Sequence, residues 1–324
     1  MDLGELKAFL IPSIERVQAL MASALASDIG LLEATNRSIL DHAGKMIRPV
    51  MSLLVAGACG EVGEDTIRFA AAAELLHNAT LLHDDVVDGA QERRGQPTVS
   101  SILSGPASVL IGDYWLVKAM QCILDASRGS SEVIHVFAKT LSDLAEGEML
   151  QLEKASRCDT TEADYIRIIY SKTASLFESS ARAAALSVGA DGPAVESVAS
   201  YARHLGLAFQ IKDDIFDYVS GSEVGKPVGI DLLEQKITMP LLCALEAAPS
   251  EARTVRDAVR RIGEEPALAD TVRDFVRAHD GVALAGTRLD GYVEKAVVSL
   301  SPLPDSAEKS YLAQLARYVG ERTC

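Results

Sequence analysis

The sequence predicts an all-α protein, and three observations lead to this fold class. Alanine and leucine, which favour helices, dominate a chain of 324 residues in which 48% are hydrophobic. Apolar residues recur at helical spacing in most segments, starting with residues 3–27. Strict alternation of apolar and polar residues, the pattern of a strand, never extends beyond a few positions. We therefore expect one all-α domain that spans residues 1–324.

Glycine and proline divide the first half of the chain into helices. Gly44 and Pro49 form a break that leaves two basic side chains near a helix start. Four consecutive alanines at residues 70–73 allow a long helix to pack closely against its neighbours. A polar loop that contains Gly89 and Gly95 follows this helix. The predicted helices cover residues 3–27, 50–59, 66–87 and 108–124.

The second half is expected to be helical as well. Thr161 and Asp164 form a capping-box pattern, with Asp in place of the usual Glu, and open a helix that contains Lys172. Residues 220–229 form a polar, glycine-containing loop, which is a candidate lid. Further helices are predicted over residues 132–152, from 193 to 218, over 239–246, and in the segments after 251 and 267.

The acidic composition argues against nucleic acid as a partner. The chain has 31 basic and 46 acidic residues, a formal net charge of −15, whereas nucleic-acid-binding surfaces are basic. The same charge is compatible with an anionic substrate, because a bound Mg²⁺ ion reverses the local sign at carboxylates.

The cysteines and the N-terminus favour a cytoplasmic location. Five cysteines are scattered without Cys-x-x-Cys spacing, which favours reduced thiols over a disulfide framework or a zinc site. The first residues lack the basic segment and apolar core of a signal peptide. We expect no apolar run of the roughly 18 to 20 residues that a membrane helix requires. The protein is therefore expected to be soluble.

The helix predicted over residues 66–87 ends in three carboxylates. On a helix, Asp84 and Asp88 lie four residues apart on one face, and His77 lies two turns earlier on nearly the same stripe. Like charges at this spacing repel, and carboxylates near a helix C-terminus oppose the helix dipole. The pair therefore indicates a functional role, although an ordinary solvated helix end would also account for one such cluster.

A second copy of the Asp-Asp-x-x-Asp pattern favours the functional interpretation. Residues 210–218 contain Asp213, Asp214 and Asp217, again after an apolar helical run. Two clusters on two helices suggest two carboxylate walls facing one cavity. Such walls suit Mg²⁺, a hard cation that completes its shell with water and phosphate oxygens. Basic residues that fit a phosphate ligand follow the clusters: Arg93 and Arg94 after the first, and Lys226 after the second.

In their order along the chain, these motifs resemble the trans-isoprenyl diphosphate synthase family, the head-to-tail polyprenyl synthetases, of the long-chain type. The resemblance implies one bundle of long antiparallel helices around a deep central cavity, the isoprenoid synthase type. The C-terminal part is similar only in being helical. The matching motifs are Gly44–Pro49, Leu82–Asp88, Arg93–Thr98, Gly112–Leu116, Glu146–Leu152, Tyr170–Ala174, Gln210–Tyr218, Gly225–Pro227, Asp231–Leu232 and Lys236–Pro240.

The resemblance also implies a reaction and its partners. The enzyme would ionise an allylic prenyl diphosphate and condense it with successive isopentenyl diphosphates. Mg²⁺, about three ions per active site with substrate bound, would be held by carboxylates and phosphates. A homodimer is implied, and the product is expected to partition to the membrane.

The matching positions take their roles from the resemblance. Metal ligands would be Asp84, Asp88 and Asp213, with weaker participation by Asp85, Asp214 and Asp217. The allylic diphosphate would contact Arg93, Lys172 and Lys226, and isopentenyl diphosphate would contact Lys45, Arg48, His77 and Arg94. Thr173 and Gln210 would offer oxygen dipoles to the developing cation. The family usually has arginine and glycine where this chain has Leu233 and Gln235, which leaves phosphate binding by Lys236 open.

The helix wall before Asp84 predicts the product length, because the growing chain extends away from the metals. Ala79 and Thr80 form the first level of this wall, with Leu76 and Ala73 deeper. Family members with short products carry aromatic residues at the first level. We therefore expect a hexa- to decaprenyl product, stopped deeper in the protein by residues such as Phe137 or Met149.

Three alternatives accompany this interpretation. A short-chain farnesyl or geranylgeranyl diphosphate synthase would share the same motifs. A class I terpene cyclase needs no second diphosphate site, so Lys45 and Arg48 argue against it. A non-catalytic regulatory subunit of a heteromeric synthase would not need two intact Asp clusters.

Overall fold

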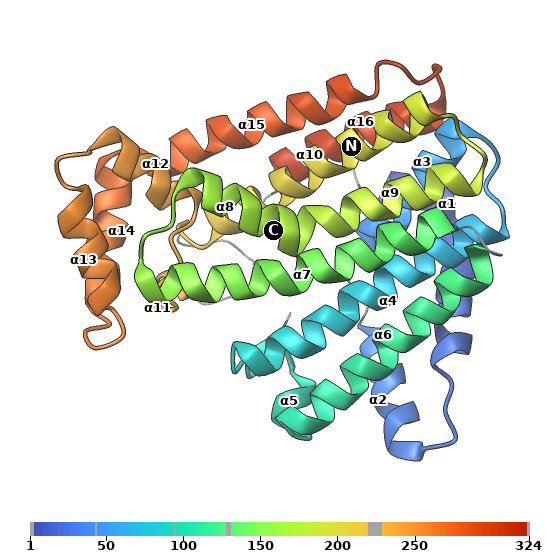
Figure 1. Cartoon of the computed structure of the whole chain (residues 1–324), viewed down its shortest axis with the longest axis horizontal. Helices are drawn as coiled ribbons and strands as arrows, with labels where there is room; N and C mark the ends of the chain where they lie inside the picture. The colour runs from blue at the N-terminus through green and yellow to red at the C-terminus, as the bar shows by residue number, and fades with distance from the viewer. Residues whose placement is uncertain (1–2, 43, 94, 128–130, 220–228, 323–324) are drawn as a thin grey trace. The chain divides into compact units, whose positions relative to one another are not determined.

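The computed structural model describes residues 3–42, 44–93, 95–127, 131–219 and 229–322, almost entirely as helices (Figure 1). The predicted all-α class is therefore confirmed; within these ranges the only sheet is a hairpin of two short strands. The residues pack as two compact units. The first contains Met1–Ala138, Ser179–Ala199 and Leu300–Gln314, and the second contains Lys139–Glu178, Ser200–Ser299 and Leu315–Cys324. The single-domain organisation stays a prediction.

The first unit is built around α4 (Glu64–Val87), which includes the first Asp cluster. Every residue of α4 from Phe69 to Leu76 is buried, so this helix needs small or apolar residues around most of its circumference. It packs against α1, α3 and α6, and Figure 1 shows α4 and α6 side by side. The other elements that lie mainly in this unit are α1 (Leu3–Leu25), α2 (Gly30–Asp41), α3 (Ile47–Cys59), β1 (Glu92–Arg93), β2 (Gln96–Pro97), α5 (Val99–Ile102) and α6 (Gly105–Ser127).

Small residues allow α6 to approach α4 closely. A side chain at Gly112 would clash with the ring of His83, which already lies against α6. The hydroxyl of Ser108 donates to the carbonyl oxygen of Leu82 at 2.8 Å. The imidazole Nε2 of His83 is 3.2 Å from Oδ1 of Asp113. These contacts fix the end of α4, where the Asp cluster begins, against a long neighbouring helix.

A buried hydrogen-bond chain joins α2 to α1 and α6. The indole N–H of Trp115 donates to Oδ1 of Asn36 at 2.8 Å, and Nδ2 of Asn36 donates to the carbonyl oxygen of Leu25 at 2.8 Å. Trp115 and Asn36 are both buried. Because each buried polar group has a partner, burial costs little here and the packing of the three helices is specified.

The second unit contains most of the C-terminal helices. The capping box predicted at Thr161 is confirmed: the Asp164 N–H donates to Thr161 Oγ1 at 3.2 Å, and the Thr161 N–H donates to Asp164 Oδ2 at 3.1 Å. The helix that it opens is interrupted by one π-helical turn. The remaining elements are α7 (Ser131–Arg157), α8 (Glu162–Ile169), η1 (Tyr170–Ala174), α9 (Ser175–Ser187), α10 (Gly192–Phe216), α11 (Ile230–Leu233), α12 (Met239–Ala247), α13 (Ala252–Arg261), α14 (Leu268–Ala278), α15 (Gly281–Ser299) and α16 (Ala307–Glu321). Helices α7, α9, α10 and α16 contribute residues to both units.

An arginine fixes α13 to the end of α7. Arg256 donates from Nη1 to the carbonyl oxygen of Cys158 at 3.0 Å and from Nη2 to that of Thr160 at 2.9 Å. The last carbonyls of a helix have no donor within the helix. The guanidinium group therefore satisfies backbone acceptors that packing would otherwise leave without a partner.

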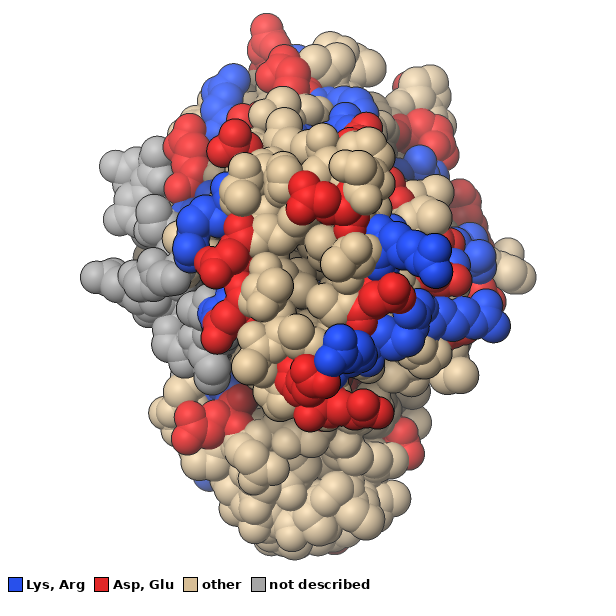
Figure 2. Space-filling view, turned by 90° about the vertical axis from the view of Figure 1, so that its left-hand side faces the viewer, with Lys and Arg blue, Asp and Glu red and all other residues tan. Residues whose placement is uncertain are grey.

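Acidic and basic side chains are interleaved on the face of the molecule drawn in Figure 2. On α13 and α14, neighbouring charges form ion pairs such as Arg260–Asp257 at 2.6 Å and Arg277–Asp274 at 2.9 Å. Exposed pairs one helical turn apart contribute about 0.3–0.5 kcal/mol each. Their main effect is to keep this surface polar.

Two apolar helices are longer than we expected. The windows Ala8–Leu25 and Gly105–Ala126 have a mean hydropathy of 1.2 over 18 and 22 residues. The expectation that no apolar run reaches the length of a membrane helix is therefore wrong. A helix can contain a few charged residues and still have the mean hydropathy of a membrane-spanning helix. Length and composition alone do not distinguish a span from a packed helix, and 39% of the second window is buried.

Candidate active site

The first Asp cluster lies at the C-terminal end of α4. Asp84 is half-buried and Asp88 is exposed, and the Asp88 N–H donates to the carbonyl oxygen of Asp84 at 2.8 Å. The helix therefore continues to Asp88, so both carboxylates start from one face of α4, as their spacing predicts. Asp85 differs from these two because it points into the protein and is 4% exposed.

Arg93 forms an ion pair with Asp85. Its Nε is 2.7 Å from Oδ1 of Asp85, and it is carried by the small hairpin of β1 and β2. Burial raises the pKa of Asp85, and the guanidinium group of Arg93 opposes that rise. Arg93 was predicted to contact a diphosphate; here it also ties the hairpin to α4. Arg94 lies outside the described residues.

Of the residues predicted to bind isopentenyl diphosphate, Arg48 lies on α3 and His77 on α4, which pack against each other, and Lys45 lies two residues before α3. Between Lys45 and Arg48, at the start of α3, Met46 has a left-handed backbone with φ of 52°. Arg48 is buried, whereas Lys45 is half-buried. His77 is half-buried on α4, two turns before Asp84. The structure thus brings all three to one pair of adjacent helices.

Three of the four residues predicted to set product length lie on one stripe of α4. Thr80, four residues before Asp84, lies about 40° around the helix from it and is half-buried. Leu76 and Ala73 continue this stripe and are fully buried. The stripe ends at Phe69, whose ring is 6.3 Å from that of Phe137. Phe137, predicted as a deep stop, is fully buried, whereas Met149, the other residue predicted as a deep stop, is 66% exposed and therefore does not lie deep in the protein.

Ala79 differs from Thr80 in the direction that it faces. It lies five residues before Asp84, about 140° around the helix. It is fully buried one turn before His83, and its carbonyl oxygen is 3.3 Å from the position that a Cβ at Gly112 would occupy. Ala79 therefore lies toward α6, and Thr80 is the better placed of the two for contact with a growing chain. The role of Ala79 in product length stays a prediction.

In the second cluster, Asp214 is the buried member and is held by two donors. The hydroxyl of Tyr165 donates to Oδ2 at 2.6 Å, and Nε2 of Gln210 donates to Oδ1 at 2.9 Å. Burial raises the pKa of Asp214 to about 6, the hydrogen bonds oppose this rise, and the charges of Asp213 and Asp217 add to it. This carboxylate is oriented by the protein and has both oxygens engaged.

Asp213 is paired with an arginine from the end of the chain. Nη2 of Arg322 is 2.6 Å from Oδ1 of Asp213 and donates to the carbonyl oxygen of Phe209 at 2.9 Å. The guanidinium carbon is 4.1 Å from the centre of the Phe209 ring. The Arg322 side chain is 6% exposed, but that of Asp213 is 41% exposed. Asp213 is therefore the accessible carboxylate of this cluster, beside a buried cation.

Asp217 organises the backbone that follows the cluster. Its Oδ1 accepts the N–H groups of Gly229 and Ile230 at 3.1 Å each, and its Oδ2 accepts the Asp231 N–H at 3.2 Å. Gly229 has φ of 86°, a conformation that glycine adopts without strain. Asp217 therefore holds the start of α11. Lys226, in the candidate lid before it, lies outside the described residues.

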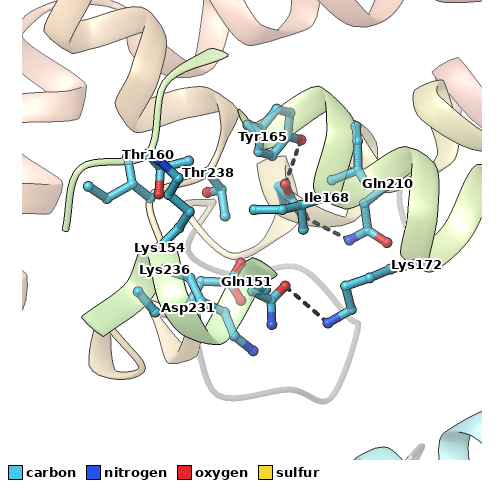
Figure 3. A pocket seen from close by; sticks show the side chains of 14 residues that line it. Gln151, Lys154, Thr160, Tyr165, Ile168, Lys172, Gln210, Asp231, Lys236 and Thr238 are labelled. Atoms are coloured by element: carbon cyan, nitrogen blue, oxygen red, sulfur yellow. Dashed lines mark hydrogen bonds between the residues drawn. The ribbon is translucent and has the colours of Figure 1, made fainter. Parts of the chain in front are cut away.

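Lys172 and Thr173 occupy the π turn and contact two different helices. Nζ of Lys172 is 2.7 Å from Oε1 of Glu148 and donates to Oε1 of Gln151 at 3.0 Å, as Figure 3 shows for the second contact. The hydroxyl of Thr173 donates to Oε1 of Gln210 at 2.8 Å. A continuous chain of hydrogen bonds thus runs from Thr173 through Gln210 to the Asp cluster.

A cavity of about 140 Å³ in the second unit collects several of the predicted residues. Lys172, Gln210 and Lys236 line it, as Figure 3 shows. Asp214 lines it as well. Its full lining is Gln151, Lys154, Ala155, Thr160, Tyr165, Ile168, Ile169, Lys172, Gln210, Asp214, Asp231, Lys236, Ile237 and Thr238. Three lysines beside two carboxylates suit a polar, anionic ligand.

Leu233 and Gln235, the two departures from the family pattern near Lys236, lie in different surroundings. Gln235 adopts a left-handed backbone with φ of 59°, which explains why the family usually has glycine there. The strain, about 1 kcal/mol, is opposed by a 2.7 Å hydrogen bond from its amide to the carbonyl oxygen of Arg260. Leu233 is exposed. Lys236 pairs with Glu234 at 2.5 Å and still reaches the cavity.

The carboxylates at the end of α4 fit Mg²⁺. This ion is usually bound by one or two carboxylates and completes its octahedral shell with water and phosphate oxygens. Asp84 and Asp88 offer such a pair, and Asp213 offers an accessible carboxylate in the second unit. Within the described part of the chain, no three His, Cys, Asp or Glu side chains converge on one metal position. A bound ion would therefore complete its shell with water or substrate oxygens.

Sequence reasoning missed several residues that define this site. Arg322 had no local signal, because it lies 109 residues from Asp213. Tyr165 could have been found, since it shares a helical stripe with Ile168, Ile169 and Lys172, all of which line the cavity. Asp231 also lines the cavity, and burial and the charges of Asp214 and Asp217 raise its pKa well above the usual range.

Comparison with known proteins agrees with these features. The sequence model of the family described as polyprenyl synthetase matches residues 30–276. The octaprenyl diphosphate synthase of Escherichia coli (strain K12) is 36% identical over 324 residues, which covers 99% of each chain. The crystal structure of a polyprenyl synthase from Caulobacter crescentus CB15, complexed with calcium and isoprenyl diphosphate, has a TM-score of 0.92 and 32% identity, covering 100% of this chain and 98% of that one. A decaprenyl diphosphate synthase from Rhodobacter capsulatus has a TM-score of 0.90 and 33% identity, with 100% of both chains covered.

Proposed function

Because the chain belongs to the polyprenyl synthetase family, we propose that it condenses an allylic diphosphate with successive isopentenyl diphosphates, head to tail, and releases a long-chain polyprenyl diphosphate. The observation that carries this proposal is the pair of Asp-Asp-x-x-Asp clusters at the ends of α4 and α10, within the segment that matches the family. The buried member of each cluster, Asp85 or Asp214, is oriented by the contacts described above.

The reaction requires separation of a diphosphate anion from an allylic cation, followed by attack of the isopentenyl double bond and loss of a proton. Mg²⁺, when bound, would supply charge stabilisation at the departing diphosphate. Lys172 and Arg93 would add fixed positive charge to the same oxygens. The departing diphosphate itself would accept the proton.

Thr173 and Gln210 are proposed to face the developing cation. The Thr173 hydroxyl donates its hydrogen to Oε1 of Gln210. The lone pairs of the Thr173 oxygen therefore point away from this hydrogen bond and can face a positive charge. The amide of Gln210 is fixed in turn by Asp214. These oriented dipoles would stabilise a cation without a covalent step. Lys45, Arg48 and His77 would bind isopentenyl diphosphate.

A product longer than farnesyl is supported by the length of the stripe on α4, and a long-chain product is supported by the 36% identity to an octaprenyl diphosphate synthase. Phe69 lies fifteen residues before Asp84, about 22 Å along the helix axis. An extended isoprene unit is about as long as one helical turn, roughly 5 Å. The stripe therefore accommodates about four isoprene units, one more than a farnesyl chain, before it meets the ring pair of Phe69 and Phe137, and a longer product would have to extend past these rings.

Turnover by the purified protein tests this function. Radiolabelled isopentenyl diphosphate, an allylic primer and Mg²⁺ should give a ladder of products that ends beyond geranylgeranyl. Asp84→Ala should reduce kcat by about a hundredfold or more, since it removes charge stabilisation at the leaving group. Asp274→Ala, which breaks an exposed ion pair on α14, is the matched control. Equal rates for both variants, or no product from the wild type, would contradict the proposal.

A homodimer is proposed as well, and an exposed apolar stripe on α6 supports it. Leu110, Val117 and Leu124 are 70%, 53% and 52% exposed and recur every seven residues. This heptad spacing is typical of helices that pair along a seam, and a second copy of the chain is the proposed partner. Light scattering of Leu110→Lys should show a monomer, with Leu284→Lys on α15 as control. A monomeric wild type would refute the dimer.

We also propose a cytoplasmic location, with a product that partitions to the membrane. Cys59, Cys122, Cys158 and Cys243 are free thiols, as suits a reducing compartment. Cell fractionation with antibody detection tests the location. Recovery of the protein only in the membrane fraction would contradict it.

A further inference from the structure

The π turn η1 directs two neighbouring side chains onto two helices. The Ser175 N–H donates to the carbonyl oxygen of Tyr170, which closes a turn one residue wider than an α-helical turn. Single π turns within α-helices are rare and often occur at functional sites. Lys172 reaches Glu148 on α7, whereas Thr173 reaches Gln210 on α10.

Two glycines confine this turn from both sides. A Cβ at Gly147 of α7 would lie 2.6 Å from Cβ of Ser171. A Cβ at Gly206 of α10 would lie 2.5 Å from Cα of Ala174. Both distances are far shorter than a van der Waals contact, so only glycine allows these backbones to approach. The glycines set the position of the turn but provide no bond that keeps its extra residue.

Three side chains join the first residue of the turn to α9 and α10. The hydroxyl of Tyr170 donates to Oε2 of Glu178 at 3.2 Å. Arg203 donates to the same carboxylate through Nε at 2.8 Å and through Nη2 at 2.9 Å, a bidentate pair. The guanidinium carbon of Arg203 also lies 5.8 Å from the centre of the Tyr170 ring. We call Tyr170, Glu178 and Arg203 the clamp.

Burial and charge stabilise the hydrogen bonds of the clamp in the folded protein. Glu178 is 7% exposed, so its charge depends on the two donors that it accepts from. Burial and the neighbouring Glu178 raise the pKa of Tyr170 to about 12, so the phenol stays a donor at physiological pH. Charged, bidentate hydrogen bonds are roughly twice as strong as neutral ones.

We propose that Tyr170, Glu178 and Arg203 are positioning residues, which hold the π turn so that Lys172 can bind the diphosphate and Thr173 can face the cation. The inference rests on the proposed function for the roles of Lys172 and Thr173. Without the clamp, the turn would relax to the more favourable α-helix. An α-helical turn contains one residue fewer than this π turn, so the side chains before the turn would rotate by roughly 100° relative to those after it. This rotation would move Lys172 and Thr173 away from their partners.

The matched comparison is between Glu178→Gln and Glu196→Gln. Glu196 forms a similar bidentate pair with Arg182, which also joins α9 and α10 but does not involve the π turn. Glu178→Gln should lower kcat by about tenfold to a hundredfold, as small misplacements of catalytic groups do, and leave the KM for isopentenyl diphosphate unchanged. Glu196→Gln should change kcat less than about twofold. Tyr170→Phe removes one hydroxyl group and tests the same clamp if Glu178→Gln folds poorly.

Two further readouts separate positioning from a general structural role. Backbone amides of residues 170–175 should exchange hydrogen faster in the clamp variants and not in Glu196→Gln. In a Lys172→Ala background, the clamp variants should cost much less additional kcat, because coupled residues are not additive.

Unchanged exchange in both clamp variants, or faster exchange with full kcat, would overturn the inference. An equal loss of kcat in Glu196→Gln would do so too. If the wild type forms no prenyl product, the proposed function fails and the catalytic role of the clamp fails with it, while the exchange comparison still decides whether the clamp holds the turn.

Discussion

Substitution of Arg322 by methionine should destabilise the protein although this residue lies almost at the end of the chain. Methionine keeps the apolar stem and removes the guanidinium group. That group is 4.1 Å from the centre of the Phe209 ring, donates to the Phe209 carbonyl oxygen at 2.9 Å and lies 2.6 Å from Asp213. All three contacts are lost together in Arg322→Met.

The size of the effect follows from these contacts. A desolvated cation over an aromatic ring contributes about 1 kcal/mol. A hydrogen bond from a charged donor contributes roughly 1.5 kcal/mol. The ion pair contributes about 0.5 kcal/mol, since the Asp213 side chain is 41% exposed and water screens its charge. The free energy of unfolding should therefore fall by about 3 kcal/mol.

Urea unfolding followed by circular dichroism measures this loss. Arg317→Met is the matched control, because Arg317 is an exposed arginine on α16, the helix that Arg322 directly follows. The control should stay within about 0.5 kcal/mol of the wild type. Arg322→Met and Arg317→Met with the same unfolding midpoint would refute the anchoring role of Arg322.

Three further predictions follow from the site and the second unit. Thr80→Phe should shorten the product toward farnesyl length, whereas Ala79→Phe should mainly lower the melting midpoint, because Ala79 packs toward α6. Chromatography of the products and thermal melting distinguish the two variants. An unchanged product length in both variants would exclude this wall as the length determinant. Arg48→Ala should raise the KM for isopentenyl diphosphate with little change in kcat, which steady-state kinetics measures; the reverse split would mean that Arg48 acts on the allylic substrate. Burial and the charges of Lys295 and Arg203 lower the pKa of His204, so the unfolded chain takes up this proton first and stability is lost as pH falls below about 6.5. Urea unfolding between about pH 7.5 and about pH 5.5 should thus show a smaller loss for His204→Gln than for the wild type, and equal losses would contradict the assigned environment.

Local sequence determined the features that depend on residues close together in the chain. Helix-forming residues and their 3.6-residue period specify the all-α class. The capping box at Thr161 and Asp164 forms because its two hydrogen bonds join residues three apart. The spacing of Asp84 and Asp88 places both carboxylates on one face of α4, since the helix geometry alone fixes that relation.

The membrane-helix expectation failed for a related reason. Hydropathy along a window reports composition, and α6 is apolar both on the side that packs against α4 and along an exposed stripe. The sequence contains no direct signal of which apolar residues are covered. Only the packed structure separates Gly112, which touches α4, from Leu110, which is 70% exposed.

Tertiary structure alone decided the partners of Asp213 and Asp214. Asp214 is held by Tyr165 from 49 residues away, and Asp213 by Arg322 from 109 residues away. The π turn that carries Lys172 is admitted by Gly147 of α7 and Gly206 of α10 and is retained by the clamp, so it depends on residues from three helices, α7, α9 and α10. Periodicity specifies which face of a helix is buried, but the contacts across that face depend on how other helices pack against it, and packing is a property of the whole chain.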